Sequence, residues 1–416
     1  MHIKFIFTLL LIFISSLIYS QVKEINPPNY IKTIGFKSNT PESQLPVLKL
    51  GDYIDLEFDA LNGNEDDYYY TIDYFNFDWT PSELMKSEYL DGIDNQRIRT
   101  YENSFNTYQI YSHYKLTIPN EQTKRLKVSG NYMINIFNND NELVFSRKFM
   151  IYEDMATIGV NIKRTRDISF IQSKQKVDIT VTPKSSHFNN PKQNVKLLVV
   201  QNNNLNTAIS NLIPQYTIGN QLIYRYDSES SFWAGNEYLF FENKDIRAAN
   251  TGIQYIDLKD LYHNYLFTNY SRANRPYTYN PDINGNFLVT NIDADNPDIE
   301  ADYVWVHFSL LPEPTFKGKS IYVYGNYNNY ALSDSNKMTY DDYDNVYKCA
   351  LLLKQGFYNY KYVVVEKDGT LNEGAVSGNF YQTENNYKVI AYYRDLGKRY
   401  DRIIGFGQGS SINISN

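Results

Sequence analysis

Cysteine is nearly absent from this chain of 416 residues, which has a single thiol at Cys349. One thiol cannot form an intramolecular disulfide or a thiolate metal cluster, so a disulfide-stabilised scaffold and a zinc ribbon are both excluded. The 5 histidines include no pair at the i, i+4 spacing of a helical metal site. We therefore predict that the protein binds no metal and needs no cofactor.

Positive charge is also scarce, because 40 Lys and Arg residues stand against 47 Asp and Glu residues. Without a basic stripe we predict no nucleic-acid partner. Nucleophile-elbow, P-loop and dinucleotide-binding motifs are missing. Acidic clusters at 282–286, 293–298 and 341–344 depart from the calcium-loop pattern, so we interpret them as solvated turns. No carboxylate pair is singled out for glycoside hydrolysis, and we predict a protein that is not an enzyme.

Long apolar runs are limited to the amino terminus. Residues 5–14 are apolar except for Thr8, Lys4 precedes them, and serines follow. This pattern is typical of a signal peptide, here residues 1–20, and cleavage after Ser20 leaves Gln21 first. The run is short for a bilayer span, which needs about 20 residues, so we expect an exported protein without a transmembrane segment.

Aromatic residues are abundant: 40 Tyr, 23 Phe and 3 Trp make up 16% of the chain. Tyrosine suits half-buried strands, because its ring packs while its hydroxyl stays in water. AT-rich codon usage also enriches a protein in tyrosine, and sugar-binding surfaces use it too. Composition alone therefore does not distinguish these causes.

Strand patterns dominate the chain. Residues 53–59 alternate strictly, which places three apolar side chains inward and the carboxylates of Asp55, Glu57 and Asp59 toward water. Helical periodicity is weak, and the best short helix candidate is 255–267. Further strands are predicted at 177–182, 195–200, 321–324, 347–353, 358–365 and 386–393.

Short strands separated by turns predict an all-β protein built from three tandem immunoglobulin-like or early-set β-sandwich domains. Polar stretches at 153–157 and 293–300 mark the boundaries. The predicted units are 21–154 as an N-terminal β-sandwich, 155–300 as a middle β-rich domain and 301–409 as a C-terminal β-sandwich. Residues 410–416, after a glycine-rich stretch, are predicted to be a flexible tail.

The C-terminal unit resembles glycogen-binding modules. A strand at 321–324 runs into a polar turn at 325–329, and an aromatic strand follows at 356–362. In such modules a tryptophan after the turn and a lysine on the later strand hold sugar. Here Tyr330 and Lys361 stand at these positions, while a second stacking tryptophan has no counterpart. This resemblance implies a β-sandwich and, as an alternative function, a periplasmic or surface glycan-binding protein.

A closer resemblance extends over nearly the whole chain after residue 20. A series of short motifs is similar, in order, to the plug protein of the bacterial type IX secretion system, including its N-terminal domain. One departure is Phe-Asn-Phe at 75–77, where that family has a His-Cys-Asn type run. The motifs stand at 78–84, 88–92, 104–107, 111–114, 129–132, 235–237, 325–329 and 400–405.

This resemblance implies a non-enzymatic periplasmic protein that associates peripherally with the outer membrane. It would bind the outer-membrane translocon barrel of the type IX system and seal its periplasmic opening. The loop 78–92 is long and mixes aromatic with charged residues, so we expect it to contact the translocon. The alternative is that the loop packs only on its own sandwich. The candidate contact residues are Trp79, Pro81, Leu84 and Tyr89.

Overall fold

The computed structural model describes residues 21–37, 44–185, 188–412 and 414. Strands make up 46% of the structure and helices 5%, which confirms the predicted all-β class. The predicted signal peptide, residues 1–20, lies outside the described residues. Within them, no helix is long and apolar enough to cross a membrane. The short helices α2 (Lys86–Tyr89), α3 (Pro191–Asn194) and α4 (Pro297–Glu300) have four residues each.

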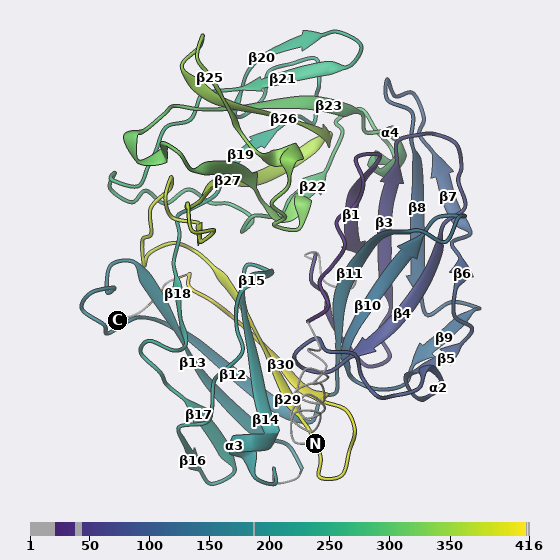
Figure 1. Ribbon diagram of the computed structural model, residues 1–416, viewed down its shortest axis with the longest axis vertical. Helices are drawn as coiled ribbons and strands as arrows, with labels where there is room; N and C mark the ends of the chain where they lie inside the picture. The colour runs from purple at the N-terminus through teal and green to yellow at the C-terminus, as the bar shows by residue number, and fades with distance from the viewer. Residues whose placement is uncertain (1–20, 38–43, 186–187, 413, 415–416) are drawn as a thin grey trace, which may run out of the picture.

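The first sandwich, at the right of Figure 1, contains the strands from β1 to β11. Its two sheets enclose a core of aromatic and aliphatic side chains that includes Leu56, Phe58, Ile134 and Phe149. A separate ribbon pairs β5 (Leu90–Gly92) with β9 (Thr123–Leu126). One sheet has the order β1 (Ile31–Lys37), β3 (Ile54–Ala60), β8 (Ser112–Ile118), β7 (Thr100–Asn103), and the other β2 (Val47–Lys49), β11 (Leu143–Tyr152), β10 (Gly130–Phe137), β4 (Tyr69–Phe75), β6 (Gln96–Arg97).

The second sandwich, at the lower left of Figure 1, combines strands from the middle of the chain with its last two strands. Its core contains Val177, Ile179, Leu197 and Val389, each fully buried. The first sheet has the order β12 (Ala156–Arg164), β13 (Lys174–Pro183), β17 (Gln221–Tyr224), β16 (Tyr216–Ile218), with β18 (Ser231–Trp233) also on β13. The second has the order β15 (Asn204–Ile209), β14 (Val195–Gln201), β29 (Asn386–Tyr393), β30 (Arg402–Ser410).

The third sandwich lies at the top of Figure 1. Its core includes Phe241, Val306, Val323 and Tyr362. One layer is built on β27 (Gly356–Val365), which pairs with β19 (Leu239–Glu242), β22 (Phe287–Val289), β24 (Ser320–Tyr324) and β28 (Leu371–Asn372). The other has the order β20 (Ile253–Leu258), β21 (Tyr262–Leu266), β23 (Tyr303–Leu310), β26 (Val346–Lys354), β25 (Thr339–Asp341).

The strand pairing departs from the predicted domain boundaries. Strands before residue 300, such as β19 and β21, pair with strands of the third sandwich, while β29 returns to pair with β14. The third sandwich is therefore inserted between two parts of the second. Whether each sandwich is an independent folding unit stays a prediction.

Three local expectations were wrong. The helix candidate 255–267 is a hairpin of β20 and β21, because its tyrosines and aliphatic residues pair across a turn at 259–261. The carboxylates of β3 are buried, with 8%, 5% and 0% of Asp55, Glu57 and Asp59 exposed. Lys37 and Lys115 pair with Glu57, Lys115 also pairs with Asp55, and Tyr303 and Lys354 of the third sandwich contact Asp59. The tail begins later than residue 410, because buried Ser411 accepts a hydrogen bond from Asn385 N at 2.7 Å.

Alternate glycines allow β30 to approach β12 closely. A Cβ atom at Gly405 would lie 2.7 Å from the carbonyl oxygen of Ala156, and one at Gly407 would lie 2.8 Å from Cβ of Ile158. Gly409 faces Val160 in the same way, at 2.8 Å. The glycine-rich stretch is therefore an ordered packing surface of the second sandwich.

Candidate docking surface and the contacts behind it

The predicted contact loop, residues 78–92, begins in a tight turn that directs Trp79 inward. Trp79 has a φ of 60°, and its N–H donates to the carbonyl of Asn76 at 3.0 Å. Only 7% of Trp79 is exposed, and the ammonium of Lys148 lies 4.2 Å from its ring centre. Trp79 is thus packed inside the protein and offers little surface to a partner.

The core that holds Trp79 joins the first sandwich to the second. Met133 and Met150 contribute from the first sandwich, and Leu198, Ile390 and others from the sheet of β14 and β29. The hydroxyl of Tyr392 donates to Oδ1 of Asn131 across this boundary at 2.7 Å. Trp79 therefore stabilises the contact between two sandwiches.

Tyr89 is likewise buried, with 5% of the residue exposed. Its ring lies 5.5 Å from Tyr74 and 6.1 Å from Tyr132, between centroids, inside the first sandwich. Burial raises the pKa of Tyr89, against the opposing effect of nearby Lys86. The structure thus places Trp79 and Tyr89 in cores and brings Pro81, which is exposed, and half-buried Leu84 to the surface.

Leu84 lines an open groove of about 700 Å³, which we call the Leu84 groove. The carboxylate of Glu88 anchors the start of α2 by accepting from Met85 N at 2.8 Å, and it also pairs with Arg399 at 2.6 Å. Lys127 donates to the carbonyl of Ser87 at 2.8 Å. The groove has apolar walls and a charged rim, formed by Leu50, Gly51, Leu84, Ser87, Glu88, Arg125, Leu126, Lys127, Val128 and Tyr400.

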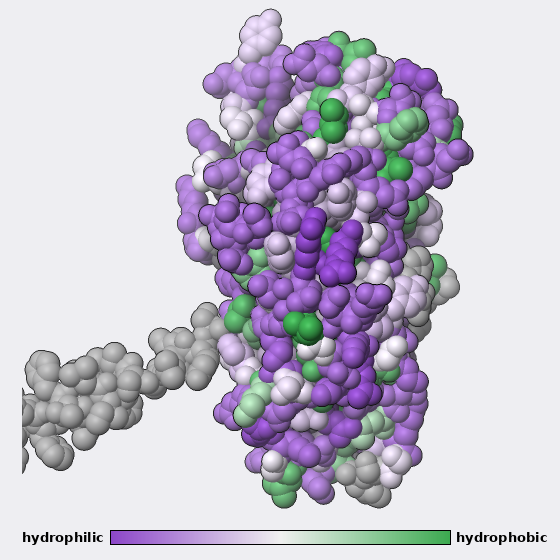
Figure 2. Space-filling view, turned by 90° about the vertical axis from the view of Figure 1, so that its right-hand side faces the viewer, coloured by the Kyte–Doolittle hydropathy of each residue, from purple (hydrophilic) through white to green (hydrophobic). Residues whose placement is uncertain are grey.

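The surroundings of this groove are mixed in polarity. Figure 2 looks at the molecule from the side of the first sandwich, and hydrophilic residues cover most of that face. Apolar residues appear there singly or in small groups. The neighbouring Met85 is 69% exposed and Leu396, in the loop before Tyr400, is 88% exposed. Such a mixture of apolar centre and charged rim is usual for a reversible protein interface.

A buried charge cluster, which the sequence did not reveal, joins the first sandwich to the third. The Nζ atom of Lys354 lies 2.6 Å from Oδ2 of Asp59, and both side chains are at most 1% exposed. Tyr303 donates to the same oxygen at 2.6 Å, and Nδ1 of His113 lies 2.7 Å from Oδ1. Burial alone would raise the pKa of Asp59, but Lys354 and His113 hold it below its usual value. We call these four residues the Asp59 cluster.

A group with metal-like spacing lies beside this cluster. Donor atoms of Glu57, His113 and Asp298 fall within 4.8 Å of one another. The ammonium of Lys37, however, lies 2.7 Å from a carboxylate oxygen of Glu57 and 2.7 Å from one of Asp298. A lysine cation thus already compensates these acids.

The two candidate glycan residues lie together, but in a packed contact between the second and third sandwiches. Tyr330 is 2% exposed, and its hydroxyl donates to the carbonyl of Asn202 at 2.8 Å. Lys361 is paired with Glu373, and its ammonium lies 5.1 Å from the centre of the Tyr238 ring. Because the β14–β15 turn covers Tyr330, the ring has no open face on which a sugar could stack.

An aromatic row on the outer sheet of the third sandwich also escaped the sequence analysis. The rings of Tyr255, Tyr265 and His307 stack across three strands at 4.2 and 4.1 Å between centroids. Nδ1 of His263 lies 2.8 Å from Nε2 of His307. Burial and the neighbouring His263 lower the pKa of His307 to about 4. The strand register that aligns these rings depends on pairing between distant segments.

Residues 31–153, from β1 to just beyond β11, match the family described as type 9 secretion system plug protein 1st domain. The first sandwich belongs to the type IX secretion plug family. The predicted family resemblance is confirmed. Membership indicates a role in type IX secretion, association with a secretion translocon, and a periplasmic or outer-membrane-associated location. The plug family is not known for enzymatic activity.

A solved structure similar to this chain is the crystal structure of a hypothetical protein from Parabacteroides merdae ATCC 43184. The two share 34% sequence identity with a TM-score of 0.89, over 94% of this chain and 100% of the other. The arrangement of three sandwiches therefore has a close counterpart in an experimental structure. No curated protein matches the chain.

Proposed function

We propose that this protein is a non-enzymatic periplasmic plug that binds the outer-membrane translocon of the type IX secretion system and seals its periplasmic opening. The match of residues 31–153 to the plug domain carries this proposal. A seal of this kind has to fill the opening as a single rigid unit, and it has to bind the translocon reversibly. It needs no catalytic centre.

The contacts between sandwiches support the requirement for a single rigid unit. The first sandwich is joined to the second by the apolar core around Trp79 and by the pair of Arg402 and Glu153. It is joined to the third by the Asp59 cluster. A fully buried ion pair with additional hydrogen bonds fixes orientation, because separating the two sides would leave charges unpaired. The first sandwich is thus joined to each of the other two.

We place the translocon contact at the Leu84 groove, with Pro81 and Leu84 as the retained candidate residues. Leu84 supplies apolar surface, while Arg125 and Lys127 supply the charged rim. Trp79 and Tyr89 act behind this surface, since both pack in cores beneath the loop. The proposed partner is the translocon barrel.

Affinity isolation from cell envelopes tests the proposal. Tagged wild-type protein is expected to recover the translocon barrel, and Leu84→Arg is expected to reduce the recovered barrel at least tenfold. The matched control is Leu143→Arg, because Leu143 is 40% exposed on β11 of the same sandwich, outside the groove. Recovery by Leu84→Arg equal to wild type would refute the groove, and failure of the wild type to recover any barrel would refute the plug itself.

Sealing is tested separately in a deletion strain. Loss of the plug is expected to raise outer-membrane permeability to large antibiotics, and reintroduced wild-type protein is expected to restore the barrier. Unchanged permeability would contradict the sealing role. Glycan-array binding that disappears in Tyr330→Ala would favour the glycan-binding alternative, although the burial of Tyr330 gives that alternative no support.

A further inference from the structure

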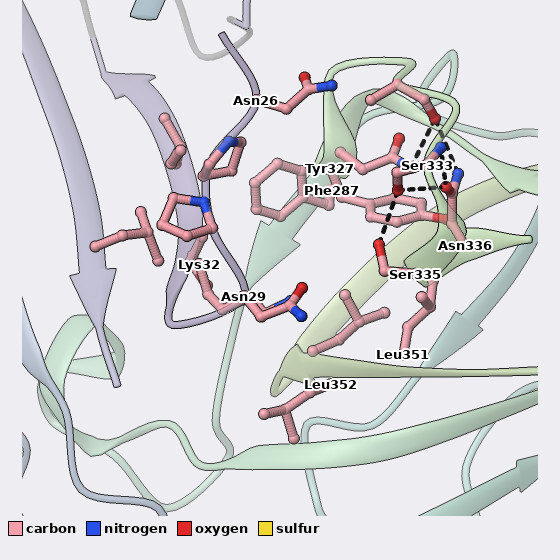
Figure 3. A pocket seen from close by; sticks show the side chains of 18 of the residues that line it. Asn26, Asn29, Lys32, Phe287, Tyr327, Ser333, Ser335, Asn336, Leu351 and Leu352 are labelled. Atoms are coloured by element: carbon pink, nitrogen blue, oxygen red, sulfur yellow. Dashed lines mark hydrogen bonds between the residues drawn. The ribbon is translucent and has the colours of Figure 1, made fainter. Parts of the chain in front are cut away.

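A cavity of about 560 Å³ lies between the first and third sandwiches, away from the Leu84 groove. In Figure 3, Asn26, Asn29 and Lys32 line one side, and Phe287, Tyr327 and Leu352 line the other. Cavities of several hundred Å³ are the usual size for small-ligand sites, especially between domains. The cavity is thus large enough for a ligand of about ten to twenty heavy atoms.

One wall is formed by an irregular stretch of β1. Pairing between β1 and β3 shifts register between Lys32 and Gly35, and Thr33, a β-branched residue, has a φ of 50°. The cavity follows this stretch, because Ile31, Lys32, Thr33 and Ile34 all line it. A β-branched residue in this region of backbone space is costly, so the surrounding structure has to hold it.

Arg147 is the unusual member of the lining. It lies on the same face of β11 as Phe145 and Phe149, which belong to the core of the first sandwich, and only 3% of Arg147 is exposed. One terminal nitrogen donates to the carbonyl of Ser146 at 2.8 Å. Among the described residues, no carboxylate lies within ion-pair distance of the guanidinium, and its Nε has no hydrogen-bond partner.

Glu24, the acid that acts on Arg147, does not pair with it. The Glu24 carboxylate acts on Arg147 at longer range, but it accepts from Lys148 N at 2.6 Å and from Nδ2 of Asn329 at 2.7 Å. Burial lowers the pKa of Arg147, and it also lowers the pKa of Lys32. Lys32 too has no ion-pair partner within the described part of the chain. The lining therefore holds two cations that form no ion pair with a described residue, and its one acid, Asp334, is exposed.

Two more buried polar atoms of the lining are unpaired. The hydroxyl of Tyr327 and Oδ1 of Asn328 make no hydrogen bond to any described residue. A buried polar atom without a partner costs about 1–3 kcal/mol, and a charged one costs more. Water could pair with the two neutral atoms, but it would leave the guanidinium charge uncompensated. A negatively charged group compensates the cations, while Oδ1 of Asn328, which is itself an acceptor, is left to water.

The opposite wall limits what else the ligand contains. Phe287 and the segment 351–353 present apolar side chains, and Pro27 and Pro28 add apolar surface beside Asn26. A fully hydrated anion such as phosphate would leave this surface in contact with water. An apolar body is therefore expected next to the anionic group.

We propose that this cavity binds a carboxylate that carries an apolar body. The carboxylate pairs with the cations of Arg147 and Lys32, and the apolar body packs against Phe287 and 351–353. Two sources have this chemistry, a free fatty acid and a short peptide that ends in an apolar residue. The site is separate from the Leu84 groove and does not depend on the plug function.

Calorimetric titration of a chain that starts at Gln21 tests the proposal with two probes and their uncharged counterparts. The probes are decanoate and N-acetyl-Leu-Leu, compared with decanol and N-acetyl-Leu-Leu amide. At least one carboxylate is expected to bind ten times more tightly than its uncharged counterpart. Binding of decanoate alone indicates a fatty acid, and binding of the peptide alone indicates a carboxyl terminus. Absence of binding by both, or equal binding of charged and uncharged probes, overturns the proposal.

Arg147→Met separates ligand binding from folding. It is expected to weaken carboxylate binding at least tenfold and to raise the melting temperature without ligand, because it removes an uncompensated buried charge. Arg99→Met is the matched control, since Arg99 is exposed on the same sandwich, and it should change neither quantity.

Lys32→Met is the second variant, because it removes the other unpaired cation of the lining and keeps a side chain of similar length. It is expected to weaken carboxylate binding severalfold. Unchanged binding in both Arg147→Met and Lys32→Met would overturn the assignment. If Arg147→Met does not fold, unchanged binding in Lys32→Met overturns it alone.

Discussion

Lys354→Met tests how strongly the first and third sandwiches are joined. The substitution replaces the buried ammonium with an apolar side chain of similar length. The Asp59 carboxylate, which is 0% exposed, keeps Tyr303 and His113 but loses the cation 2.6 Å away. Removing one partner of a buried pair costs about 3–5 kcal/mol. We expect the free energy of unfolding of a chain that starts at Gln21 to fall by about that amount in a urea titration.

A double-mutant cycle isolates the pair itself. Asp59→Asn combined with Lys354→Met removes both charges, so it should be less destabilising than the sum of the two single variants. Lys348→Met is the matched control on the same strand. Lys348 pairs with Asp341 at 2.8 Å, but the two side chains are 43% and 34% exposed. That control should cost at most about 1 kcal/mol. A coupling energy below about 0.5 kcal/mol would refute the argument that the buried pair joins the sandwiches.

Two further predictions concern packing and pH. Gly407→Ala should destabilise the chain by about 1–3 kcal/mol, because the added Cβ would lie 2.8 Å from Cβ of Ile158. Gly35→Ala is the control, because its Cβ would meet only an ordinary contact at 3.6 Å. Equal melting temperatures of the two variants would contradict the packing argument. Burial raises the pKa of Asp282 to about 7, so its protonated form is favoured in the folded chain and its contribution to stability is lost as pH rises from about 4 to about 7. Asp282→Asn should therefore gain stability relative to wild type between pH 4 and pH 8 in denaturant titrations, and a constant difference would count against this linkage.

Alternation within single strands was sufficient to predict much of the cores. In β3 the three apolar residues face inward, as the period of two requires. The same strand shows the limit of that reasoning. One of its outward carboxylates, Asp59, meets Lys354, which is 295 positions away, and no local pattern reports such a partner. A half-exposed strand and a strand covered by another sandwich therefore have the same sequence pattern.

The candidate contact residues divide in a similar way. Trp79 and Tyr89 were selected because large aromatic residues often lead an interface, but the same property makes them good core residues. Whether a ring in a loop points outward depends on its backbone, and the φ of 60° at Trp79 directs it inward. Arg147 was missed altogether, although it stands two residues from Phe145 and two from Phe149, and the period of two places it on their core-facing side.

The insertion of the third sandwich has a consequence for the order in which the chain can fold. The central strand β14 of the second sandwich pairs with β29, and β29 pairs with β30, which ends at Ser410. Until β29 and β30 have been added, the edge of β14 that pairs with β29 is free, and it is open to pairing with other chains. β29 and β30 thus complete the second sandwich, whose other strands stand much earlier in the sequence. A truncation or a bulky fusion near residue 410 should disturb the second sandwich first. The third sandwich, whose strands immediately precede β29 in the sequence, should be disturbed less.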